Sequence, residues 1–348
     1  MKRDCEQHRG GYCHLEAGET RRFTRRALLC SFGAMALAMP LASLAQKGRV
    51  PRRLGVLLVL LSPDGKEARA FKQGLLDAGY TEGRDAVIEW RSTRGDYTRL
   101  PELAAELVKQ NVELIVADTA SAVQAVRQVT SSIPVIMTIV ADPIGSGLVA
   151  NLARPGGNTT GLSIMLAELS AKRLQLLKDA FPKIARVAVL WHPLTAYHTQ
   201  ASADLKAAAP SMGIELAFID IRAPENIEAA FSGVNRARAQ AVYVLDCPLF
   251  FTHRAALVRL ASQSGLPLIS GEKPFADAGG LITYGADYAD QMRRSAGYVD
   301  KILKGAKPGD LPVEQPTKFD LVLNQKTAKA LNIRFPNSIL VRADRVIE

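Results

Sequence analysis

Two short patterns in the chain could in principle support catalysis. Gly145–Ala150 matches G-x-G-x-x-A, the turn that holds a dinucleotide, and Ser270–Lys273 matches the S-x-x-K pattern of some acyl-transfer enzymes. The glycine pattern, however, follows the fourth expected strand, whereas a dinucleotide turn follows the first. No S-D-N or K-T-G sequence accompanies the serine. Neither pattern therefore predicts an enzyme.

Other motifs that would indicate catalysis or metal binding are absent from the sequence. It contains no G-x-S-x-G, no P-loop and no H-E-x-x-H. His192, His198 and His253 lack the spacing of metal ligands, and Cys247 is the only cysteine after residue 30. We therefore expect no catalytic residues, no cofactor, no metal and no internal disulfide in the mature chain.

The elements that must position any site are short apolar runs that alternate with segments of helical periodicity. Ala68, Phe71, Leu75 and Ala78 show the three-and-four spacing of a helix with one apolar face. Gly79, Gly213 and Gly265 are typical of helix ends. The runs expected to form strands are Leu54–Leu61, Ala86–Trp90, Val112–Ala117, Ile133–Val140, Val187–Trp191, Ile214–Ile219, Ala241–Leu245, Leu268–Ser270 and Leu281–Tyr284.

This alternation predicts an α/β fold with two Rossmann-like lobes, each built on a parallel sheet. Ala153–Gly161 has turn chemistry and no apolar period, so we place a break there. A helix over Tyr288–Leu303 that docks on the first lobe, followed by a strand near Phe319–Leu323, makes a three-stranded hinge. The expected lobes are 46–162 with 284–310, and 163–283 with 311–348.

Ligands of open α/β sheets bind beyond the carboxyl ends of the strands, near the amide groups of the following helices. That rule names the residues that follow each expected strand. The candidate ligand-binding residues are Ser62, Asp64, Asp118, Thr119, Ala120, Ser121, Ala141, Asp142 and Pro143 in the first lobe, and Trp191, His192, Asp246, Gly271, Glu272 and Tyr284 in the second.

These residues suit an amino-acid-like solute, which needs acceptors for an ammonium group and donors for a carboxylate. Asp118, Asp142 or Asp246 could accept from the ammonium, and the amides and hydroxyls of 119–121 could hold the carboxylate. Trp191 and Tyr284 could flank a flat side chain. Alternatives stay open: Asp118 or Thr119 could cap a helix, and Trp191 could be a core aromatic.

Two runs of sequence resemble a known family. The run Ala141–Gly161, A-D-P-I-G-S-G-L-V-A-N-L-A-R-P-G-G-N-T-T-G, is similar to the signature of ABC transporter substrate-binding proteins of the tryptophan/tyrosine-type family. So is the run Gly297–Lys318 with the following residues to Ile333. The resemblance implies a type I periplasmic-binding fold with the ligand between the lobes. It also implies an aromatic or branched amino acid as the ligand.

The first 45 residues have the features of an export signal. Arg21-Arg22 and Arg25-Arg26 precede an apolar run, Ala27–Leu44, which ends in small residues suited to cleavage after Ala45. Thr24–Leu29 resembles a twin-arginine signal, with Sec export as the alternative. We therefore expect a periplasmic protein.

The net charge and its distribution along the chain indicate which class of partner the protein binds. The formal charge is +10, spread without the basic run that a nucleic-acid or membrane-surface partner requires. We expect a monomer that closes around a small molecule and delivers it to an ABC transporter permease in the inner membrane. The alternatives are an extracytoplasmic enzyme, a ligand sensor or a sugar-repressor-like regulator on the same architecture.

Overall fold

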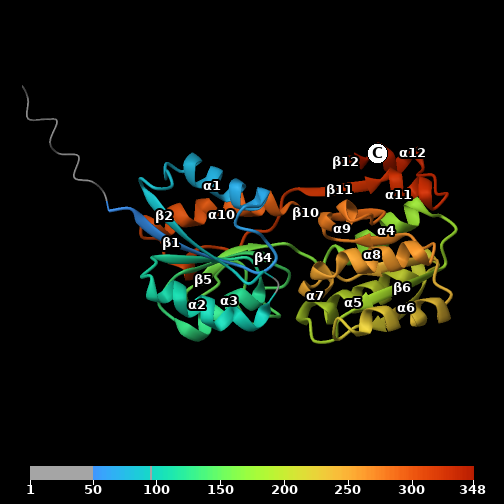
Figure 1. Cartoon of the computed structure of the whole chain (residues 1–348), viewed down its shortest axis with the longest axis horizontal. Helices are drawn as coiled ribbons and strands as arrows, with labels where there is room; N and C mark the ends of the chain where they lie inside the picture. Colours follow the sequence, from blue (N-terminus) through green and yellow to red (C-terminus); the bar gives the residue numbers. More distant parts are fainter. Residues whose placement is uncertain (1–49, 95) are drawn as a thin grey trace, which may run out of the picture. The chain divides into compact units, whose positions relative to one another are not determined.

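The structure, a computed structural model, describes residues 50–94 and 96–348. The expected export signal, residues 1–45, lies outside the described residues. Two mostly parallel sheets organise the rest, as the sequence predicts (Figure 1). We call each sheet with its helices a lobe.

The sheet of the first lobe is wholly parallel and has the order β2-β1-β3-β4-β5. Helices α1 and α10 pack against each other on one face, and α2 and α3 pack on the other (Figure 1). The elements are β1 (Arg52–Leu58), α1 (Lys66–Asp77), β2 (Ala86–Ser92), η2 (Tyr97–Arg99), α2 (Leu100–Lys109), β3 (Leu114–Ala117), α3 (Ala120–Val129), β4 (Val135–Val140), β5 (Thr159–Ser163), α10 (Tyr288–Leu303) and η4 (Pro308–Asp310).

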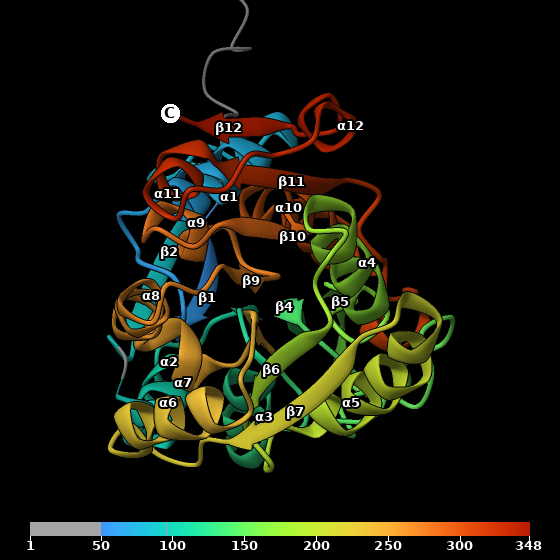
Figure 2. The same ribbon diagram turned by 90° about the vertical axis from the view of Figure 1, so that its right-hand side faces the viewer.

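The sheet of the second lobe has the order β12-β11-β10-β9-β8-β6-β7, and Figure 2 shows its two edges at β12 and β7. The elements are α4 (Ser170–Ala180), β6 (Arg186–Trp191), α5 (Ala196–Ala208), η3 (Ala209–Met212), β7 (Glu215–Asp220), α6 (Asn226–Arg236), β8 (Ala241–Val244), α7 (Pro248–Thr252), α8 (Arg254–Gln263), β9 (Leu268–Ser270), α9 (Lys273–Asp277), β10 (Ile282–Ala286), β11 (Phe319–Asn324), α11 (Gln325–Ala330), α12 (Asn337–Leu340) and β12 (Arg345–Ile347).

Two details of the expected sheets are wrong. The stretch 153–161 is not only a turn, because its last three residues begin strand β5, which pairs with β4. Strand β11 runs antiparallel to β10, with Ala286 opposite Phe319. The reason is the path of the chain: β10 leaves the second lobe toward α10, and β11 returns beside it, so the two strands run in opposite directions.

The chain crosses between the lobes three times: after β5, between β10 and α10, and between η4 and β11. Two of these crossings touch, since the Ser163 amide donates to the Glu314 carbonyl at 2.9 Å. Helix α10 packs closely against α1 of the first lobe, and the absence of a side chain at Gly74 of α1 allows this close approach. A Cβ there would lie 2.3 Å from the Arg293 carbonyl oxygen. In this arrangement the carboxyl ends of the parallel strands of the first lobe lie on one side of the crossings, and those of the second lobe lie on the other side.

Candidate functional site

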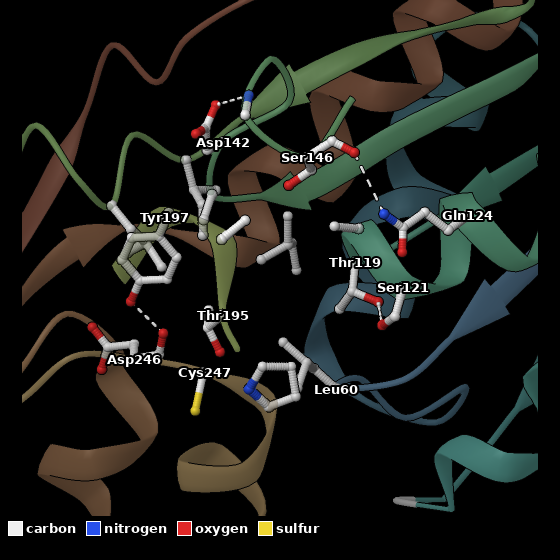
Figure 3. Close-up of a pocket in the computed structure, with 18 of the residues that line it drawn as sticks. Leu60, Thr119, Ser121, Gln124, Asp142, Ser146, Thr195, Tyr197, Asp246 and Cys247 are labelled. Atoms are coloured by element: carbon white, nitrogen blue, oxygen red, sulfur yellow. Dashed lines mark hydrogen bonds between the residues drawn. The ribbon is translucent and has the colours of Figure 1, made fainter. Parts of the chain in front are cut away.

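A cavity of about 380 Å³ is lined by residues from both lobes, at the carboxyl ends of their strands (Figure 3). In Figure 3, Thr119, which caps α3, and Ser121 and Gln124 of α3 lie on one side, and Thr195, Tyr197 and Asp246 of the second lobe lie on another. The lining residues are Leu60, Thr119, Ala120, Ser121, Gln124, Ile139, Ala141, Asp142, Gly145, Ser146, Ile164, Leu166, Leu194, Thr195, Ala196, Tyr197, Asp246, Cys247, Pro248 and Glu272. A ligand here would therefore contact both lobes.

The candidate residues from the sequence divide into three groups. Those that line the cavity are Thr119, Ala120, Ser121, Ala141, Asp142, Asp246 and Glu272. His192 lines an adjoining cavity of about 400 Å³, which shares Ser121, Thr195, Cys247 and Pro248 with the first. The candidates that line neither cavity are Ser62, Asp64, Asp118, Pro143, Trp191, Gly271 and Tyr284.

Asp118 is turned toward the backbone. It is fully buried, and its carboxylate accepts hydrogen bonds from the amides of Val59, Leu60 and Leu61 at 2.9 to 3.2 Å. Burial raises its pKa to about 6, against the effect of these bonds. Asp118 thus fixes the loop after β1, which carries the cavity residue Leu60. The helix cap of α3 is Thr119, whose hydroxyl accepts from the Ala122 amide at 3.2 Å.

The other candidates outside the cavity have neighbours of their own. The ring of Trp191 packs edge-to-face against Phe218, and the ring of Tyr284 lies against that of Phe319. Ser62 and Asp64 are exposed in the loop before α1, while the buried Pro143 forms the turn after β4. Gly271 donates its amide to the Asp246 carboxylate at 2.7 Å and so positions a lining residue.

Several lining residues were missed because the rule for open α/β sheets selects residues that follow the expected strands. Leu60 and Ile139 lie within expected strands, and Ile164 and Leu166 follow β5, which was not expected. Gln124 is three residues after Ser121 on α3, which places both on one helix face, a spacing that could have found it. Tyr197 lies in the first turn of α5, and its hydroxyl donates to the Asp246 carbonyl.

The cavity wall is acidic. Its acidic side chains are those of Asp142, Asp246 and Glu272, and the described lining residues include no lysine, arginine or histidine. Against this, the first turn of α3 presents amide N–H groups at Ala120 and Ser121, which have no acceptor within the helix. The site therefore offers acceptors for a cationic group in one part and donors for an anionic group in another.

Cys247 lines the cavity but is poorly suited to react. Burial, with Glu272 and Asp246 nearby, raises the pKa of its thiol to about 12. We expect iodoacetamide at pH 8 to alkylate Cys247 slower in the native protein than in urea, by about two orders of magnitude or more, because so little thiolate is present. Mass spectrometry of the peptide that contains Cys247 measures this rate. Equal rates in the two conditions would show that the thiol is not buried.

The part of the chain that the structure describes lacks two further features. No helix within residues 50–94 and 96–348 is long and apolar enough to span a membrane. Within the same residues, no group of three or more His, Cys, Asp or Glu side chains is arranged to hold a metal ion.

Comparison with known proteins identifies the family. A family model described as ABC transporter substrate binding protein matches residues 56–347. The chain belongs to this family. It is a family of substrate-binding proteins and not an enzyme family: its members bind a small-molecule solute outside the cytoplasm and serve an ABC transporter.

Three relatives of this substrate-binding protein are informative. A tyrosine-binding protein of Clostridioides difficile (strain R20291) is 26% identical over 284 residues, which is 81% of each chain. The structure of an ABC domain in complex with L-Trp from Streptococcus pneumonia is 25% identical, with a TM-score of 0.76, and the match covers 85% of this chain and 100% of that one. A conserved domain protein of Vibrio cholerae has the same TM-score at 26% identity, with 85% and 99% covered.

Proposed function

We propose that this substrate-binding protein takes up a zwitterionic amino acid with an apolar side chain, aromatic or branched. The observation that carries the proposal is the charge pattern of the cavity: three carboxyl groups, no basic side chain among the described lining residues, and a helix N-terminus. An ammonium group fits the first feature and a carboxylate fits the last. Relatives that bind tyrosine and tryptophan support this assignment.

The side-chain preference follows from the rest of the wall. Leu60, Ile139, Ile164, Leu166 and Leu194 contribute apolar surface around the polar groups. Leu194 is 80% exposed although it lines the cavity, so it has apolar surface to bury against a ligand. Burying such surface contributes about 25 cal/mol per Å², which favours apolar side chains over polar ones.

We propose further that the protein works in the periplasm as a monomer, after cleavage of the leader following Ala45, and delivers its ligand to a permease in the inner membrane. Ligand contacts from both lobes would favour a closed form, and the closed surface would be the one that the permease binds. The paired arginines of the leader and the three crossings between the lobes support this mechanism.

A panel of head-group analogues tests the ligand class. L-tryptophan, L-tyrosine and L-leucine are compared with indole-3-propionate, which lacks the ammonium group, and with tryptamine, which lacks the carboxylate. We expect at least one amino acid to bind and to raise the melting temperature, and each truncated analogue to bind about 10- to 100-fold more weakly. Calorimetry measures the affinities. Tighter binding of a sugar or a nucleoside would overturn the proposal.

A further inference from the structure

One buried carboxyl oxygen in the cavity wall has no hydrogen-bond partner among residues 50–94 and 96–348. Glu272 follows β9, lines the cavity and is only 4% exposed. Its Oε1 atom accepts a hydrogen bond from the Tyr288 hydroxyl at 2.6 Å. Its Oε2 atom is buried and has no hydrogen-bond partner among the described residues. A buried polar atom in this state is costly unless a ligand or water satisfies it.

The other two carboxyl groups of the wall differ from Glu272. Asp246 is also buried, but Oδ1 accepts from the Ser270 hydroxyl and Oδ2 accepts from the Gly271 amide at 2.7 Å. Asp142 is partly exposed, and its Oδ1 accepts from the Gly145 amide at 2.7 Å. Glu272 therefore combines burial with a free acceptor, and the other two do not.

The position of Glu272 is fixed from both sides. Tyr288 lies in the first turn of α10, just after the second crossing between the lobes, so its hydrogen bond joins the cavity wall to the hinge. On the other side, the Glu272 amide donates to the Ser270 hydroxyl at 3.1 Å. A carboxyl group held in this way loses little conformational freedom when a ligand arrives, which strengthens the contact.

We propose that Oε2 of Glu272 accepts a hydrogen bond from the ammonium group of the bound amino acid, and that Glu272 is the residue that selects amino acids over analogues without an amino group. This assignment rests on the proposed function. An ammonium group supplies three donors and a positive charge, and a charge-assisted bond to a buried carboxylate is among the stronger hydrogen bonds in proteins.

Proton release provides an independent signature of this contact. Burial, and then the charge of Asp246, raise the pKa of Glu272 well above its ordinary value, against the effects of Tyr288, Arg173 and Arg254. The further titratable groups near it are Tyr197, Cys247 and Tyr97. The ammonium group favours the ionised carboxylate and so lowers this raised pKa. Binding therefore releases protons to the buffer at pH values between the pKa of the free and of the ligand-bound carboxyl group, and affinity rises with pH across that range.

The test compares Glu272→Gln with the unchanged protein, using L-tryptophan and indole-3-propionate as probes. Glutamine keeps the shape and the acceptor for Tyr288 but cannot carry the charge. We expect the variant to bind L-tryptophan about 10- to 100-fold more weakly and to bind indole-3-propionate within about 3-fold of the parent. Calorimetry in buffers of different ionisation enthalpy should show proton release with L-tryptophan in the parent only.

Two further variants control the comparison. Asp64→Asn removes an exposed carboxylate outside the cavity and should change neither affinity. If Asp142→Asn removes the preference for L-tryptophan while Glu272→Gln keeps it, the assignment is overturned. Equal losses for both probes in Glu272→Gln would also overturn it, since they indicate a structural role. If the parent binds no amino acid, the assignment and the proposed function both fail. If a variant fails to fold, proton release on binding to the parent still tests the assignment.

Discussion

Replacing Arg173 with methionine is expected to lower the free energy of unfolding by about 3–5 kcal/mol. Arg173 is fully buried on α4. Its guanidinium donates from Nε to the Tyr284 carbonyl at 2.7 Å and from Nη1 to the Leu166 carbonyl at 3.1 Å. It is also the cation beside the buried Asp246. Methionine fills the space of the stem but removes one donor from each of two buried carbonyls and the positive charge beside a buried carboxyl group.

Urea unfolding followed by circular dichroism measures this loss as a lower midpoint with an unchanged slope. Arg173→Lys keeps the charge but not the planar fork, so we expect it to lie between the parent and Arg173→Met. Arg259→Met is the surface control, because Arg259 is exposed and pairs with an exposed Glu228 at 3.4 Å. It should change stability by less than about 0.5 kcal/mol. A loss below about 1 kcal/mol in Arg173→Met would contradict the argument.

The Arg173 interactions also connect stability to binding. Leu166 lines the cavity, and its carbonyl is held by Arg173 and by the Ser170 hydroxyl. Tyr284, the other partner, belongs to β10, which leads into the second crossing. Arg173 thus positions the wall of the site and the hinge strand together, although it does not line the cavity itself.

Much of the fold could be predicted because apolar runs and helix-ending glycines are local signals. Gly79, Gly213 and Gly265 all have positive φ at the ends of helices, where glycine is favoured. Strand β5 could not be predicted, because only Leu162 among its five residues is a large apolar side chain. It is nevertheless wholly buried, and the Thr160 hydroxyl donates to the Leu311 carbonyl at 2.7 Å. That partner is 151 residues away in the chain, so no local pattern reveals it.

The candidate site shows the same limit. The rule for open α/β sheets selects the positions after each strand, and it brings Thr119, Asp142 and Glu272 to one cavity. The rule cannot predict whether a carboxylate side chain at such a position points into the cavity or toward the backbone. Asp118 directly follows β3, yet it binds three amides of the neighbouring loop because β1 lies beside β3 in the sheet. Whether such a residue faces ligand or backbone depends on tertiary contacts that the sequence does not display.

Gly161 shows how one residue can control the junction between the lobes, and Gly161→Ala is expected to lower the free energy of unfolding by about 3–5 kcal/mol. Its φ is +129°, and a Cβ there would lie 2.1 Å from the Met137 carbonyl oxygen of β4. Its own carbonyl accepts from the Glu314 amide at 3.0 Å in the third crossing. Alanine would therefore push β5 away from β4 and disturb two crossings at once.

Gly297→Ala is the matched control, since Gly297 lies within α10 and nothing would contact the added Cβ. It should stabilise the protein by about 0.5–1 kcal/mol, because alanine loses less backbone entropy in a helix. Thermal and urea unfolding distinguish the two variants, and a Gly161→Ala protein as stable as the parent would show that β5 can shift freely. If Gly161→Ala lowers the free energy of unfolding and Gly297→Ala raises it, the junction between the lobes requires the close approach of β5 to β4 at Gly161, and the loss of a glycine is not destabilising in itself. They would also give a physical reason for the glycine that ends the run Ala141–Gly161.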